Sequence, residues 1–145
     1  MGMTCFVSHT SVDCRNAYEL SEFWRELLAY EMDVDDPNEP GHEECAIHDP
    51  QSGHVILFLE VPDAKAVKNR IHFDLRPRDG VTRDEEVQRV LTLGATQVED
   101  CRGIHGTGTG WVVLADPEGN EFCILRSPHE VEAGGAEQAD AGQGA

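Results

Sequence analysis

The 145-residue sequence predicts an α+β fold made of two similar halves. Each half begins with a strand that carries a histidine, His9 in the first half and His72 in the second, and continues into an amphipathic helix. Seven residues after each histidine stands an amide or acidic residue, Asn16 in the first half and Asp79 in the second. About three further strands are expected after each helix. Because two such half-modules must share a core, a ligand pocket is expected where they meet.

The first half predicts a strand, a helix and then further strands. Cys5 to Val12 alternates loosely and ends at a turn-prone run, which is typical of a strand. Asn16 and Glu19 make a capping pair at the start of the helix. Glu31 to Asp49 is acidic and interrupted by proline, which predicts a loop with short strands at its ends, and His54 to Val61 predicts a buried strand. The helix presents one apolar stripe, formed by Leu20, Phe23, Trp24, Leu27 and Leu28.

The second half repeats this order. Arg70 to Arg76 alternates with period two, which puts Ile71, Phe73 and Leu75 on one face of a strand. Thr82 and Glu85 repeat the capping pair for a helix over 84–93, and Gly94 is placed to end it in a left-handed conformation. The opposite, polar face of the strand carries His72, Asp74 and Arg76.

Three strands should complete the second half, over 96–98, 111–115 and 121–126. The turn-forming run Asp116–Asn120 joins the last two as a hairpin. We therefore expect a single domain over 1–127, with module 1 at about 4–62 and module 2 at about 69–127. Residues 128–145 are acidic, rich in Gly and Ala and without apolar periodicity, which predicts a flexible tail.

Composition excludes several classes of partner. A net charge of −17 repels nucleic acid and anionic membrane surfaces. No apolar stretch is long enough to span a bilayer, and the N-terminus lacks the features of a secretory signal. The five cysteines are odd in number and contain no Cys-x-x-Cys pair, so neither a disulfide framework nor a zinc knuckle is expected. These features predict a reduced, cytoplasmic protein.

Several motifs occur in the order and spacing of a known superfamily. They are His9 with Asn16, the strand Asn69–Leu75, the helix end Leu93–Ala95 and the hairpin Trp111–Leu125. Over residues 5–126 the chain resembles the vicinal oxygen chelate superfamily, which includes glyoxalase I, bleomycin-resistance proteins and extradiol dioxygenases. This resemblance implies two βαβββ modules that form an open mixed β-barrel. It also implies a homodimer.

The same resemblance implies a divalent metal site (Ni, Zn, Mn, Mg or Fe). First-strand ligand positions fall on His9 and His72, whereas the glutamate position of the last strand falls on Cys123. Glu121, two residues earlier, is the alternative metal ligand or general base, and the first-module equivalent lies near Leu59 or Glu60. With one carboxylate or none, only weak metal binding is expected.

Two functions of different class follow. In one, the protein is a glyoxalase-type lyase, isomerase or dioxygenase in which the metal chelates vicinal oxygens of a small molecule and a carboxylate shuttles a proton. In the other, the cavity binds a small molecule or drug without metal or turnover. An interaction domain is a third possibility. The ligand-binding residues would be Asp74 and Arg76 for polarity, Trp111 and Phe122 for apolar surface, and Cys123 as a zinc thiolate or a small apolar residue.

Residue types alone leave other roles open for the histidines. The polar strand face of His72 fits a solvated surface as well as a cavity lining. His9 equally fits a hydrogen-bonded core histidine.

Overall fold

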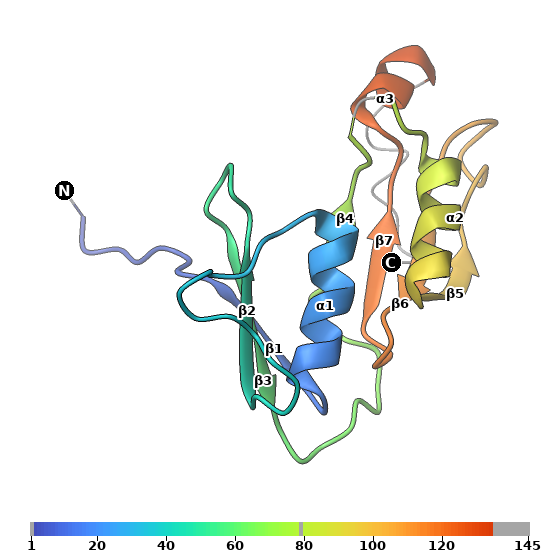
Figure 1. Cartoon of the computed structure of the whole chain (residues 1–145). Coiled ribbons are helices and arrows are strands. Elements are labelled where there is room, and N and C mark those ends of the chain that lie inside the picture. Colours follow the sequence, from blue (N-terminus) through green and yellow to red (C-terminus); the bar gives the residue numbers. More distant parts are fainter. Residues whose placement is uncertain (1, 79, 135–145) are drawn as a thin grey trace. The chain divides into compact units, whose positions relative to one another are not determined.

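The computed structural model describes residues 2–78 and 80–134. This part of the chain is a mixed α+β structure with three helices and two small sheets (Figure 1). It divides into two compact units, the first ending at Lys65 and the second beginning at Ala66, and each unit contains one sheet. Asp79, the expected counterpart of Asn16, lies outside the described residues.

The first unit contains β1 (Thr10–Cys14), α1 (Ala17–Leu28), β2 (Glu44–His48) and β3 (Val55–Glu60). Its strand order is β1-β3-β2, with β1 parallel and β2 antiparallel to β3. The helix packs against β2 and β3 (Figure 1). An isolated bridge between Glu31 and His48 stands where the sequence predicted one more strand.

Local sequence explains α1. The Asn16 side chain accepts a hydrogen bond from the Glu19 amide at 3.0 Å, which confirms the predicted cap. The Glu60 carboxylate adds a second acceptor for the helix start, from the Ala17 amide at 3.0 Å. The helix ends at Ala29, which takes the left-handed conformation at φ 55°. Its predicted apolar stripe is buried at Leu20, Phe23, Trp24 and Leu27.

The predicted strand from Cys5 to Val12 is wrong in its boundaries. β1 begins at Thr10, which pairs with Ile56 near the start of β3. The segment before it lies outside the described ladder, and Phe6 and Val7 are exposed. A strand needs a neighbour as well as a pattern, and the ladder with β3 sets this boundary.

The second unit contains β4 (Asp74–Leu75), α2 (Arg83–Leu93), β5 (Thr96–Asp100), β6 (Val112–Ala115) and β7 (Glu121–Ile124). The strand order is β4-β7-β6-β5. β4 runs parallel to β7, and the other neighbours are antiparallel. The predicted order of one strand, one helix and three strands is confirmed for this half.

The capping predictions in this unit are confirmed. Thr82 and Glu85 form a reciprocal capping box at the start of α2, and Gly94 ends the helix at φ 119°. The turn after β6 is held by Asp116, whose carboxylate accepts from the Glu118 and Asn120 amides. β6 and β7 therefore form the predicted hairpin.

The strand predicted over 70–76 is much shorter than expected. β4 covers two residues, although the Phe73 carbonyl also accepts a hydrogen bond from the Cys123 amide at 2.9 Å. Ile71, predicted to face the core, is 88% exposed. Alternation predicted the face of each residue correctly only where a strand forms, and the length of the strand depends on its pairing with β7.

The prediction of a flexible tail from residue 128 is wrong for its first part. Pro128–Gly134 forms the helix α3. Ser127 and Glu130 make a reciprocal capping pair: the Ser127 amide donates to the Glu130 carboxylate at 2.8 Å, and the Ser127 hydroxyl accepts from the Glu130 amide at 3.2 Å. This Ser-x-x-Glu signal was visible in the sequence. Residues 135–145 lie outside the described residues.

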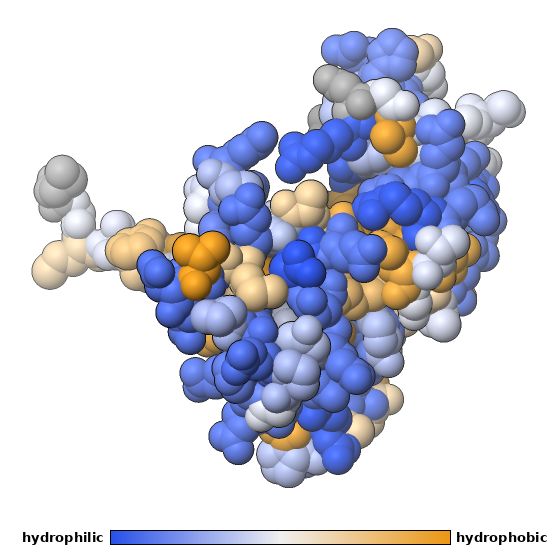
Figure 2. Space-filling model, viewed as in Figure 1, coloured by the Kyte–Doolittle hydropathy of each residue, from blue (hydrophilic) through white to orange (hydrophobic). Residues whose placement is uncertain are grey.

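The surface agrees with the composition. Most of the face shown in Figure 2 is hydrophilic, as expected for a chain with 28 acidic residues. Among the described residues, no helix combines the length and the apolar character that crossing a bilayer requires.

Candidate metal and ligand site

In the second unit, His72, Asp74 and Cys123 come together. Each offers one potential ligand atom, and these atoms all lie within 4.8 Å of one another. The backbone pairing explains the arrangement, because Asp74 on β4 is the direct parallel partner of Cys123 on β7. His72 lies two residues before Asp74, just outside the strand, and its ring approaches the Asp74 carboxylate.

The imidazole and the carboxylate in this group lie very close together. His72 Nδ1 lies 3.2 Å from Asp74 Oδ1. Nevertheless, Nδ1 is shielded from solvent and has no hydrogen-bond partner, so the short approach does not have hydrogen-bond geometry. A buried polar atom in that state needs an explanation, and an ion between the donors would satisfy it.

Cys123 supplies the third donor. Its side chain is buried, and burial raises the pKa of its thiol to about 12, with a further rise from Asp74 and an opposing effect of Lys68. The neutral thiol hydrogen-bonds to Asp74. A metal at this position would have to displace the thiol proton.

Apolar residues surround this polar group. Cys123 belongs to a buried cluster in which Trp111 is 1% exposed. The indole Nε1 of Trp111 has no hydrogen-bond partner, and its ring stacks on His105 with centroids 5.8 Å apart. A buried indole donor without a partner is unusual, because buried polar groups are normally hydrogen-bonded. The other members of the cluster are Cys101, Val113 and Leu125.

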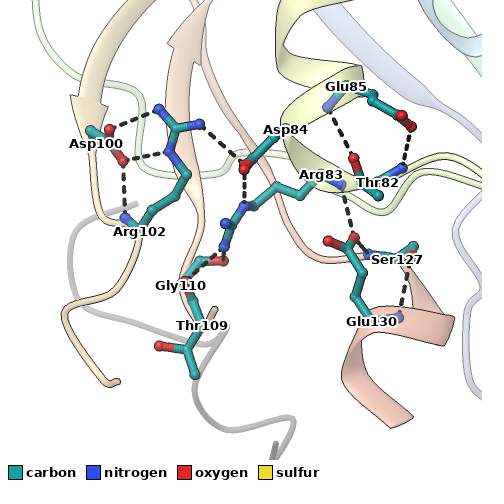
Figure 3. Close-up of polar contacts among 10 residues, drawn as sticks. All are labelled: Thr82, Arg83, Asp84, Glu85, Asp100, Arg102, Thr109, Gly110, Ser127 and Glu130. Carbon is teal, nitrogen blue, oxygen red and sulfur yellow. Dashed lines mark hydrogen bonds and ion pairs between the residues drawn. The ribbon is translucent and has the colours of Figure 1, made fainter. Parts of the chain in front are cut away.

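The loop that carries His105 is anchored at its base (Figure 3). Arg83, at the start of α2, donates to the carbonyl oxygens of Thr109 and Gly110 at 2.7 and 2.9 Å. Its Nε donates to Asp84 at 2.9 Å, and Asp84 also accepts from Arg102 at 3.1 Å. This network fixes the residues directly before Trp111.

Other predicted site residues have structural contacts of their own. The Glu121 carboxylate accepts a hydrogen bond from the Asn69 backbone amide at 3.1 Å. Glu121 is not part of the His72–Asp74–Cys123 group. Arg76 donates to the Arg126 carbonyl at 2.8 Å. Phe122 is adjacent to Cys123 in β7 and therefore lies on the opposite face, where it pairs with Leu114.

In the first unit, His9 is exposed, and its Nδ1 lies 3.0 Å from the Ser8 hydroxyl. Its pairing with His72 stays a prediction. Of the two candidates for the first-module carboxylate position, Glu60 caps α1, and Leu59 pairs with Asp13.

Sequence reasoning assigned Asp74 to ligand polarity and not to the metal. The His-x-Asp spacing on a strand could have revealed this role, because it places two donor side chains on one face.

Comparisons with known proteins agree with this architecture. Residues 9–125 match the sequence model of the glyoxalase-like domain family. Among solved structures, a variant of the fosfomycin resistance protein FosX from Listeria monocytogenes, complexed with Mn(II) and 1S,2S-dihydroxypropylphosphonic acid, has a TM-score of 0.63 at 16% identity. That match covers 94% of this chain and 95% of FosX.

Two further solved structures are similar. FosX from Mesorhizobium loti has a TM-score of 0.59 at 14% identity and covers 90% of this chain and 99% of its own. A glyoxalase/bleomycin resistance protein/dioxygenase family enzyme from Burkholderia phytofirmans PsJN has a TM-score of 0.58 at 18% identity. That match covers 81% of this chain and 94% of the Burkholderia enzyme. The search of curated proteins gave no match.

Proposed function

Because the chain belongs to the glyoxalase-like domain family, we propose that it is a metal-assisted enzyme that acts on a small, oxygen-bearing, anionic molecule. The observation that carries this proposal is the convergence of His72, Asp74 and Cys123, with the His72 Nδ1 atom buried and without a hydrogen bond. The Mn(II) complexes of FosX support a metal in a fold of this kind.

The donor set favours zinc among the divalent ions considered. One nitrogen, one carboxylate oxygen and one thiolate suit Zn²⁺, whereas Mg²⁺ and Mn²⁺ prefer oxygen donors. Three protein ligands leave a coordination position for water or substrate, as in catalytic zinc sites. When bound, the ion would supply Lewis-acid polarisation of a substrate oxygen.

The charge of the neighbouring segment supports an anionic substrate. Residues 65–78 contain five basic residues and one acidic residue, in a chain whose 28 acidic residues outnumber 11 basic ones. Within this segment, Lys68 acts electrostatically on Cys123. A local excess of positive charge beside the site favours an anionic ligand. The buried Trp111 Nε1–H, which has no hydrogen-bond partner, would be a donor for one of its oxygens if the ligand reaches the apolar cluster beside Cys123.

We further propose that the two units are the two modules of an open mixed β-barrel, as in the resembling superfamily. We propose a cytoplasmic homodimer as its working state.

One observation favours a second function, a binding protein without metal or turnover. The Cys123 thiol is neutral, with its pKa raised to about 12 by burial and by Asp74, and it already has Asp74 as a hydrogen-bond partner. In that case Trp111 and the local positive charge alone would hold the ligand.

Calorimetric titration of the purified protein with Zn²⁺ separates the two functions. The sequence predicted only weak metal binding, but with Asp74 and Cys123 beside His72 we now expect sub-micromolar affinity, weakened at least about 10-fold by His72→Ala and by Cys123→Ser. Matched controls are His42→Ala and Cys5→Ser, which change a partly exposed histidine and an exposed cysteine in the first unit. A wild-type affinity weaker than roughly 100 µM, or no effect of His72→Ala, would favour the metal-free function.

A further inference from the structure

We infer that Asn69 and Glu121 form a clamp that positions His72 against Cys123. This inference rests on the proposed function of the site, because it concerns how two of its donors are held together. It assigns Glu121 a positioning role in place of the metal-ligand or general-base role that the sequence predicted. Glu121 would act through a backbone amide and not through the ion.

Four hydrogen bonds build the clamp, all within the second unit. The Asn69 side-chain oxygen accepts from the Glu121 amide at 2.7 Å, and the Asn69 amide donates to the Glu121 carboxylate at 3.1 Å. The Asn69 side-chain nitrogen donates to the Glu121 carbonyl at 3.2 Å and to the Ile71 carbonyl at 2.7 Å. Both the backbone and the side chain of each partner are therefore engaged.

The clamp lies where regular pairing ends. β4 contributes only Asp74 and Leu75 to the sheet, so His72 precedes the strand. Ile71, just before His72, is 88% exposed and gives the segment no apolar anchor. Hydrogen bonds must therefore fix this segment, and the clamp supplies them three residues before His72.

Glu121, the other residue of the clamp, is also close in sequence to a residue of the site. Glu121 is the first residue of β7, and Cys123 follows two residues later on the same face. Joining Asn69 to Glu121 therefore sets the offset between the segment that carries His72 and the strand that carries Cys123. Outer hydrogen-bond partners that orient metal ligands typically change metal affinity about 10–100-fold when removed.

A positioning role and a ligand role predict different effects of two substitutions at Glu121. Glutamine keeps a side-chain oxygen that can accept from the Asn69 amide, whereas alanine removes that acceptor. If Glu121 has the positioning role, the Zn²⁺ affinity of Glu121→Gln should stay within about 3-fold of the wild-type value. Glu121→Ala and Asn69→Ala should each weaken Zn²⁺ binding about 10–100-fold. If Glu121 were a ligand, Glu121→Gln would be as damaging as Glu121→Ala.

Glu60→Ala provides the matched control. Glu60 is also a strand-end glutamate whose carboxylate accepts from a backbone amide, that of Ala17 at 3.0 Å, but it serves α1 in the first unit. Loss of the Glu60 carboxylate should leave the Zn²⁺ affinity within about 3-fold of the wild-type value. The double variant Asn69→Ala/Glu121→Ala should bind more weakly than either single variant, because each single variant leaves at least one hydrogen bond between the two residues in place.

A measurement without metal keeps the inference testable if zinc does not bind. The Cys123 amide donates to the Phe73 carbonyl at 2.9 Å, so its hydrogen exchange reports how firmly the segment after the clamp is held. In metal-free protein, Asn69→Ala should speed exchange of this amide at least about 10-fold while amides of α2 remain protected. Unchanged exchange, or equal damage from Glu121→Gln and Glu121→Ala, would overturn the clamp. Absence of zinc binding by the wild type would instead count against the proposed function.

Discussion

Gly110 occupies a position that no other residue fits. Its φ is +91°, and a Cβ there would collide with the Cys101 carbonyl oxygen. We expect Gly110→Ala to lower the free energy of unfolding by roughly 3 kcal/mol or more, because the backbone must move in addition to adopting a strained conformation. Urea unfolding followed by circular dichroism measures this change.

Gly108 gives the matched control for Gly110. It also has a positive φ, +80°, but a Cβ there would meet nothing within 4 Å. Gly108→Ala should therefore cost only the left-handed backbone penalty, about 1–2 kcal/mol. Equal losses for the two variants would show that close approach to Cys101 is not what requires glycine at 110.

Arg83 is the second residue whose environment fixes its identity. Its buried guanidinium donates to the Thr109 and Gly110 carbonyls (Figure 3). Arg83→Gln should lower the free energy of unfolding by about 2–4 kcal/mol, because two carbonyls lose a charged donor in a buried place. The exposed Arg89, paired with Glu86 within α2, serves as control, and Arg89→Gln should cost no more than about 0.5 kcal/mol.

At the scale of elements, the helix caps were predictable because their signals are local. The Thr82 hydroxyl accepts from the Glu85 amide, and the Glu85 carboxylate accepts from the Thr82 amide. Thr82→Ala should destabilise the protein by about 1 kcal/mol, measured as a shift in the urea midpoint. Thr92→Ala removes a hydroxyl from the exposed side of the same helix and should change stability by less than about 0.5 kcal/mol.

Strands were less predictable than helices for a physical reason. The apolar pattern of Cys5–Val12 favours a strand, yet the ladder begins at Thr10, opposite Ile56 in β3. Arg70–Arg76 alternates cleanly, yet only Asp74 and Leu75 join the sheet. A strand is stabilised by its neighbour, and a neighbour distant in sequence leaves no local trace. Helix α3 is the opposite case, since its Ser127–Glu130 capping pair was present and was overlooked.

At the scale of the whole molecule, the free energy of unfolding should depend on pH, because carboxylates of this acidic chain form ion pairs with arginines. Two side-chain hydrogen bonds and one backbone hydrogen bond from Arg102 lower the pKa of Asp100 to about 2. The pKa of Asp84 is also lowered, because bonds from Arg83 and Arg102 outweigh the effect of burial, which raises it. A carboxylate with a lowered pKa stabilises the fold above its unfolded-state pKa, and this contribution is lost as the pH falls towards its folded-state value.

The unfolding free energies of wild type and Arg102→Gln should therefore differ most above about pH 5 and converge between about pH 4 and 2. Urea titrations at pH 6 and pH 3 would measure this convergence. Arg70→Gln, a change at an exposed arginine of the same unit, should show no such pH-dependent difference. A constant difference between wild type and Arg102→Gln would contradict the role of these carboxylates.

The sequence by itself determined the α+β class, the two capped helices, the hairpin and the family, because these depend on local patterns and on motifs in order. It also placed His72 and Asp74 on one strand face. Only the tertiary structure decided that Cys123 lies beside them and that Glu121 turns to Asn69. Both contacts arise where segments about 50 residues apart meet at the β4–β7 edge, and parallel pairing across a long crossover has no local sequence signal.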